Sequence, residues 1–177
     1  RLLSSNGMPF RFDTMRIHCE LLDHRFELSP RPERVVCLTS GVTEALFAMG
    51  CGERIVGVST YCSRYVPDLK VPVAGDYLNV NRDVLRELRP DLILLTTGVQ
   101  RGLGLRLARE GLPVYALPLP NSYPAILENI LAAAALLDEM VEGRRLVEAM
   151  ELLAAGMRKR APTPRPRVYA ELWFGKH

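Results

Sequence analysis

The sequence lacks most of the features by which a metalloprotein is recognised. Its 177 residues include only three histidines and four cysteines, and no two cysteines have C-x-x-C spacing. His18 and Cys19 are adjacent, but adjacent residues of a strand point to opposite faces and do not easily reach one ion. We therefore expect no metal site, and we interpret Cys37, within an apolar run, as a small buried side chain.

An excess of charge of one sign is also missing. The chain has 23 basic and 20 acidic residues, a formal charge of +3, with no basic run interleaved with aromatic residues. Nucleic acid is therefore not an expected partner. The longest apolar stretch, residues 125–137, is interrupted by Glu128 and Asn129, so we expect a soluble chain without a transmembrane segment. Residues 1–12 lack the apolar core of a signal peptide.

The sequence contains no catalytic or nucleotide-binding signature. The patterns G-x-G-x-x-G, G-x-x-x-x-G-K-[ST], G-x-S-x-G and H-E-x-x-H do not occur. We accordingly predict no catalytic residues. An α/β nucleotide-binding enzyme is the weaker alternative, because it would need a phosphate-binding loop.

What the sequence does have is an alternation of short apolar runs and helical segments. Residues 15–22 and 25–28 predict a hairpin, which a proline-containing break at 29–32 ends. Strands are then predicted at 34–38, 55–58, 71–74, 92–95 and 114–117, and helices at 41–49, 81–88 and 103–110, with Asn81 as an N-cap. This order predicts an α/β fold with a mainly parallel sheet and right-handed crossovers.

The composition changes after residue 117. Three prolines mark a connector, and residues 125–160 are almost unbroken helix formers with apolar side chains at helical spacing. Gly143 is predicted to dent or split this helix. Residues 167–173 resemble the first strand of a second sheet, so the sequence is expected to be truncated.

The loop after the first sheet strand, Thr39-Ser40-Gly41, is the first candidate for ligand binding. In open parallel sheets, ligands bind outside the carboxyl ends of the strands, where backbone N–H groups at a helix start can bind an anion or a ligand amide. The alternative is an ordinary helix start, with Ser40 as the cap and Glu44 favourable to the dipole. On this loop alone the ordinary cap is the favoured interpretation.

Four sequence blocks occur in a characteristic order. Residues 28–50 hold a P-x-R-V-V strand, a loop ending in T-E and an apolar helix ending A-M-G. Three further blocks follow: I-V-G-V before Tyr61-Cys62, then G-D-Y-L-N before L-R-P-D-L, and finally G-L-P-V. Together these blocks resemble the periplasmic binding protein family for uptake of cobalamin, haem and iron siderophores. Ser40 replaces a family proline, and Ser63 and Arg64 replace an aspartate and a proline.

The resemblance implies a two-lobed binding protein in which each lobe is an α/β parallel-sheet sandwich and one long helix joins the lobes. The chain would then comprise a tail or expression remnant (1–14), an N-terminal ligand-binding lobe (15–120), a long connecting helix (121–161) and the start of a truncated second lobe (162–177).

The implied function is the substrate-binding component of an ABC importer. It would capture cobalamin, haem or a ferric siderophore and deliver it to a membrane permease, without enzymatic activity or a cofactor of its own. Its location would be periplasmic or extracytoplasmic and membrane-associated if a signal or lipid anchor was removed, and cytoplasmic otherwise. A cytosolic corrinoid or metal-chelate sensor or carrier is the alternative.

The same resemblance assigns site residues. The ligand-binding candidates are Thr39, Ser40, Gly41, Tyr61, Tyr77, Thr96 and Trp173, and Asp83 is the candidate for docking to the permease. Aromatic faces suit a large planar macrocycle because they bury much area with little loss of entropy. Each assignment has an ordinary alternative: a tyrosine or Trp173 packed on a core, and Asp83 stabilising its helix through the dipole.

Overall fold

The computed structural model describes residues 14–169, and its centre is a five-stranded parallel sheet of order β5-β4-β3-β6-β7. The strands are β3 (Val35–Cys37), β4 (Ile55–Ser59), β5 (Val73–Gly75), β6 (Leu92–Thr96) and β7 (Val114–Leu117). The α-helices are α1 (Ser40–Ala48), α2 (Arg82–Leu88), α3 (Arg101–Arg109), α4 (Tyr123–Leu136) and α5 (Met140–Arg160). The predicted α/β class and parallel sheet are confirmed.

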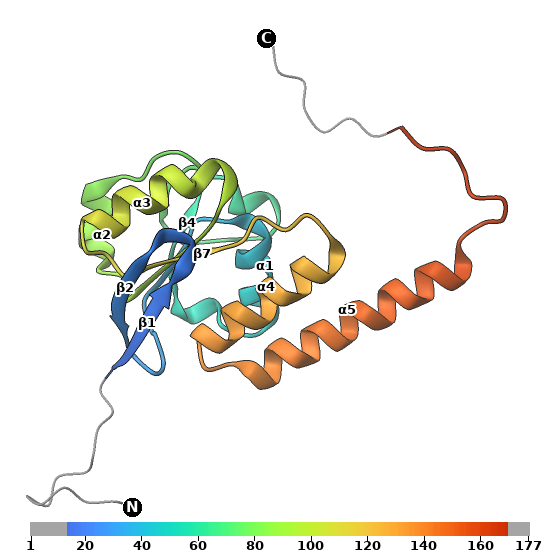
Figure 1. The fold of residues 1–177 in the computed structure, drawn as a ribbon, viewed down its shortest axis with the longest axis horizontal. Helices are drawn as coiled ribbons and strands as arrows, with labels where there is room; N and C mark the ends of the chain where they lie inside the picture. Colours follow the sequence, from blue (N-terminus) through green and yellow to red (C-terminus); the bar gives the residue numbers. More distant parts are fainter. Residues whose placement is uncertain (1–13, 170–177) are drawn as a thin grey trace, which may run out of the picture.

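Two apolar layers cover the sheet because its strand side chains alternate between faces. Val35 and Cys37 point into a core shared with α1, α4 and α5, while Val36 and Leu38 point into a second core shared with α2 and α3. Figure 1 shows α2 and α3 on one side of the sheet and α1 and α4 on the other, with α5 lying outside α4. The lobe is therefore a sandwich in which both faces of the sheet are buried.

The predicted N-terminal hairpin is present and covers one edge of the sheet. It consists of β1 (Met15–Cys19), the 3-10 turn η1 (Glu20–Leu22) and β2 (His24–Leu28), with antiparallel pairing. The backbone N–H of Ala116 in β7 donates to Cys19 Sγ at 3.3 Å, and His24 Nε2 lies 2.9 Å from the carbonyl oxygen of Leu112. The hairpin thus partly satisfies the backbone of an edge strand that would otherwise be open.

The prediction of one long helix over residues 125–160 is wrong. The chain forms two helices, α4 and α5, which reverse direction through residues 137–139, where Asp138 has a left-handed φ of 58°. Gly143 does not break the helix either: it is buried within α5, where a Cβ would overlap that of Ala134 in α4. Both segments are strong helix formers, so composition does not mark the reversal.

Residues 161–169 have no regular secondary structure. Most of the strand predicted at 167–173 lies outside the described residues.

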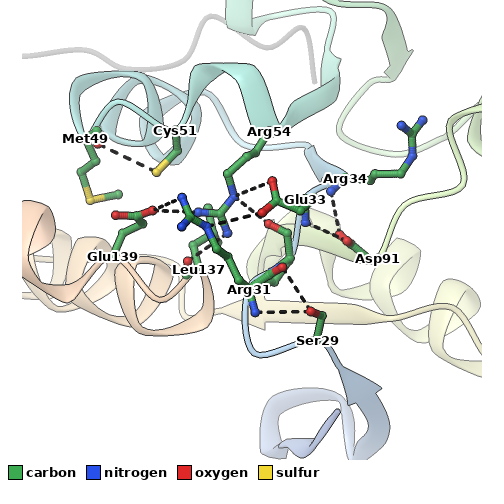
Figure 2. A network of polar contacts seen from close by, with 11 residues as sticks. Ser29, Arg31, Glu33, Arg34, Met49, Cys51, Arg54, Asp91, Leu137 and Glu139 are labelled. Carbon is green, nitrogen blue, oxygen red and sulfur yellow. Dashed lines mark hydrogen bonds and ion pairs between the residues drawn. The ribbon is translucent and has the colours of Figure 1, made fainter. Parts of the chain in front are cut away.

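A buried arginine holds the reversal between α4 and α5 (Figure 2). Arg54 ends the short turn η2 (Gly52–Arg54), and its side chain is only 7% exposed. It donates to the carbonyl oxygens of Pro32 at 2.6 Å and Leu137 at 2.9 Å, and to Glu139 Oε1 at 3.0 Å. The guanidinium of Arg54 therefore bonds three separate segments: Leu137 after α4, Glu139 before α5, and Pro32 in the linker before β3.

The same network extends along the amino ends of the strands. Arg31 donates to Glu139 and pairs with Glu33, and the backbone N–H groups of Glu33 and Arg34 donate to the two carboxylate oxygens of Asp91 at 2.8 and 2.9 Å. This polar network lies at the end of the sheet opposite to the loops described next, so its role is structural.

Candidate functional site

A pocket opens at the carboxyl ends of β3 and β6. The chain runs outward from β3 through β4 to β5 and then returns to the other side of β3 at β6, so these two strands flank the topological switch point where open α/β sheets bind ligands. The pocket has a volume of about 280 Å³. Its lining residues are Thr39, Gly41, Val42, Thr96, Leu119, Pro120, Ile126, Asn129 and Ile130.

The predicted residues Thr39, Gly41 and Thr96 thus meet in one pocket, and Ser40 does not join them. Ser40 is 6% exposed, and its hydroxyl is buried without a hydrogen-bond partner. The alternative role of Ser40 as the helix cap is wrong, because Thr39 is the N-cap residue of α1 and the cap makes no side-chain hydrogen bond. The pocket therefore lies at the start of α1, where no side chain caps the first backbone N–H groups of the helix.

Gln100 is the main residue of this site that is absent from the predicted set. It ends the short turn η4 (Gly98–Gln100), and it is 1% exposed. Its Oε1 accepts from the backbone N–H and the hydroxyl of Thr96 at 3.1 and 3.0 Å, and its Nε2 donates to the carbonyl oxygen of Leu38 at 3.0 Å. Gln100 therefore ties the ends of β3 and β6 together below the pocket. In the sequence, only its position four residues after the end of an apolar strand could have indicated that Gln100 belongs to the site.

The far wall of the pocket comes from the loop between β7 and α4. Asn129 Nδ2 donates to the carbonyl oxygen of Pro118 at 2.9 Å, and the N–H of Leu119 donates to Thr97 Oγ1 at 2.8 Å. Leu119 is 60% exposed even though these bonds fix its backbone. The result is an apolar rim at the edge of the pocket, with its backbone held by these two bonds.

Tyr61 and Tyr77, both predicted for the site, stack on each other. Their ring centroids are 4.5 Å apart and the planes differ by 10°. Tyr61 follows β4 and Tyr77 follows β5, so the stack lies at the same end of the sheet as the pocket. The guanidinium of Arg64 lies over the Tyr61 ring at 5.4 Å from its centroid. We call this pair of rings the tyrosine stack.

Buried hydroxyl and thiol groups hold the segment that carries Tyr61. Tyr61 caps the short turn η3 (Cys62–Arg64), and Cys62 is fully buried. Cys62 Sγ lies 3.2 Å from Ser59 Oγ and 3.3 Å from Thr43 Oγ1. The turn is thereby fixed to both β4 and the first part of α1.

Burial also raises the pKa of the nearby Cys37 thiol from 9.0 to about 12, an increase that its hydrogen bonds with Thr43 and Thr39 partly offset. Cys37 then binds a proton more tightly in the folded chain than in the unfolded one. We expect its stabilising contribution to be complete below about pH 9 and to be lost as pH rises toward 12, by up to about 1.4 kcal/mol per pH unit. Urea unfolding at several pH values between 8 and 11 measures this slope. A Cys37→Ala variant that retained the full slope would contradict the assignment.

The predicted docking residue, Asp83, does not line the pocket. Asp83 is in the first turn of α2, with its side chain 82% exposed and paired with Arg86 at 2.7 Å. The N-cap of this helix is Asn81, as predicted, and its side chain accepts from the N–H groups of Asp83 and Val84. Trp173 lies outside the described residues. Over residues 14–169 we find no cluster of three metal-ligating side chains and no helix that meets the length and hydropathy needed to span a bilayer.

The sequence profile of the periplasmic binding protein family matches residues 35–176. The chain belongs to this family. The match includes every strand of the parallel sheet and both loops of the site. The predicted resemblance, which rested on four ordered blocks, is confirmed.

Individual relatives agree with this assignment. A cobalamin-binding protein of Halobacterium salinarum is 26% identical over 84% of this chain and 42% of its own length. A vitamin B12-binding protein of Yersinia pestis is 34% identical over 47% of this chain and 30% of its own. The solved periplasmic heme-binding protein of Roseiflexus sp. RS-1 superposes with a TM-score of 0.65 at 28% identity, covering 73% of this chain and 50% of that one. The chain thus spans half or less of the length of these relatives.

Proposed function

We propose that this chain forms one wall of the ligand site of a substrate-binding protein of an ABC importer, and that the ligand is cobalamin, haem or a ferric siderophore. The observation that carries the proposal is that an apolar pocket and the tyrosine stack lie at the same end of the sheet. Large, flat chelates bury much apolar area, and rigid aromatic and apolar surfaces bind them at low entropic cost.

The proposed ligand wall has two parts. Thr39, Gly41 and Thr96 line the pocket, and Tyr61 and Tyr77 present aromatic rings at the same end of the sheet without lining the pocket itself. In this proposal the protein acts by binding alone and has neither a catalytic centre nor a resident cofactor. Family membership supports it, since the family consists of binding proteins.

Two further parts of the proposal concern location and partner. We place the protein outside the cytoplasm, as its family suggests. We also propose that Asp83 contacts the permease, because it is a well-exposed carboxylate on the first helical turn after the strand β5. Its partner Arg86 is exposed as well, so the ion pair between them can exchange for one with a partner protein at little cost.

Replacing Tyr77 with alanine tests the ligand wall. We expect the dissociation constant for the bound chelate to rise several-fold, because one aromatic face is lost, while the melting temperature changes little since Tyr77 is only half-buried. The measurement is isothermal titration of the purified chain with cyanocobalamin, haemin and a ferric siderophore. Tyr65, 55% exposed and outside the stack, gives the matched Tyr65→Ala control.

Two results would contradict the proposal. If the wild-type chain bound none of the three chelates, the proposed function would be wrong, and tight binding of a nucleotide would favour the enzyme alternative instead. A large drop in melting temperature for Tyr77→Ala, without a specific loss of binding, would instead place Tyr77 in the core.

A further inference from the structure

The turn that carries Tyr77 is held by the side chain before it. Asp76 Oδ1 accepts from the backbone N–H of Leu78 at 2.6 Å and from that of Asn79 at 2.8 Å, and the N–H of Asp76 donates to the carbonyl oxygen of Asn79 at 2.8 Å. These three hydrogen bonds close residues 76–79 into a tight turn that contains Tyr77. The hydrogen bonds from Leu78 and Asn79 also hold the pKa of Asp76 below its ordinary value.

The start of the turn admits only a residue without a side chain. A Cβ on Gly75 would overlap the carbonyl oxygen of Asn79. The carbonyl oxygen of Gly75 in turn accepts from the N–H of Thr60, the residue before Tyr61, at 2.9 Å. The two loops that carry the tyrosines are therefore joined directly through their backbones.

A third element holds the turn from the side. Arg106, on α3, donates through Nη2 to the carbonyl oxygen of Leu78 at 2.5 Å. The same helix begins next to Gln100, which binds the ends of β3 and β6. Thus α3 connects the floor of the pocket to the turn of Tyr77, and the two parts of the ligand wall share one rigid support.

We infer that Asp76 and Arg106 are positioning residues for Tyr77: they hold the turn in the conformation that stacks Tyr77 on Tyr61 and so preset the aromatic part of the ligand wall. The inference rests on the proposed function for its effect on binding, but not for its effect on the stack. A preset wall binds more tightly because less side-chain and loop freedom is lost when the ligand arrives.

The test measures the stack and the binding separately. The ring protons of Tyr77, assigned by NMR in tyrosine-labelled protein, report the ring current of Tyr61, and a Tyr61→Leu variant gives their shift without the stack. We expect Asp76→Ala to move the Tyr77 resonance most of the way to that value and to weaken chelate binding about tenfold. Asp76→Asn keeps one oxygen acceptor and should retain much of the original shift. Arg106→Met should act in the same direction as Asp76→Ala, but less strongly.

Asp91→Ala is the matched control. Asp91 also accepts two backbone N–H groups, but at the opposite end of the sheet. It should lower stability and leave both the Tyr77 resonance and the binding unchanged. Arg109→Met, at an exposed position one turn along from Arg106, should change neither.

The inference is wrong if Asp76→Ala leaves the Tyr77 resonance in place, or if Asp91→Ala moves it equally. If the wild-type chain binds no chelate, the proposed function fails, but the NMR shift still decides the role of Asp76 and Arg106.

Discussion

Replacing Arg54 with methionine is expected to lower the free energy of unfolding by about 3–5 kcal/mol. Methionine keeps the apolar stem of the side chain but removes every donor. Glu139 and the carbonyl oxygens of Pro32 and Leu137 then lose their charged partner in a largely buried place. Urea unfolding, followed by far-ultraviolet circular dichroism, measures the loss.

Arg31→Met provides the comparison for this prediction. Arg31 contacts Glu139 as well, but its side chain is 62% exposed, so its loss should cost less than about 1 kcal/mol. The double variant Arg54→Met with Glu139→Gln should be more stable than the sum of the two single effects predicts, since removing both partners leaves no buried charge. An effect of Arg54→Met as small as that of Arg31→Met would show that the network is not needed for the reversal between α4 and α5.

The second large effect is expected at Gln100. Gln100→Leu fills a similar volume but removes three hydrogen bonds, leaving the carbonyl oxygen of Leu38 and the N–H and hydroxyl of Thr96 without their partner. Each buried group left unpaired costs about 1–3 kcal/mol, so for three such groups we expect a total loss of at least about 3 kcal/mol. Urea unfolding measures this loss, and faster amide exchange at Thr96 would locate it.

Gln100→Glu separates the two sides of this contact. An ionised carboxylate can still accept from Thr96, but it cannot donate to Leu38. One of its oxygens then faces the carbonyl oxygen of Leu38, and the two repel each other. The pKa of the introduced carboxyl should therefore be raised in the folded chain. Protonation of the introduced carboxyl should restore the lost stability below the ordinary glutamate pKa of about 4.3. The stability should fall again as pH rises through the raised pKa of this carboxyl in the folded chain. A variant whose stability did not depend on pH in this range would contradict the assigned geometry.

The sheet could be predicted from the sequence because its signals are local. Runs such as residues 92–95 are continuous, apolar and bounded by turn residues, and β6 lies there with both faces covered. The reversal at residues 137–139 could not be predicted in the same way. It depends on Arg54, more than 80 residues earlier in the chain, and on close packing at Gly143. Contacts of this kind leave no periodic pattern in either segment.

The site, like the fold, could be predicted only where its residues follow from local signals or from the order of the strands. Thr39, Gly41 and Thr96 follow strands whose ends must meet, so their places followed from the topology of the sheet. The tyrosine stack followed only in part: the family resemblance selected Tyr61 and Tyr77, but their contact depends on the backbone bond between Thr60 and Gly75. Gln100 and Asp76 act through backbone groups, and residue type alone does not reveal such roles.

The length of α5 has a consequence for the surface of the lobe. Its 21 residues span about 31 Å, and Leu152, Leu153 and Met157 in its second half are well exposed. In Figure 1 this second half projects away from α4. The first half of the helix is anchored on the core through Met140, Leu146, Val147 and Met150, so only the second half extends beyond that packing. The second half therefore presents an apolar surface that the described part of the chain leaves exposed.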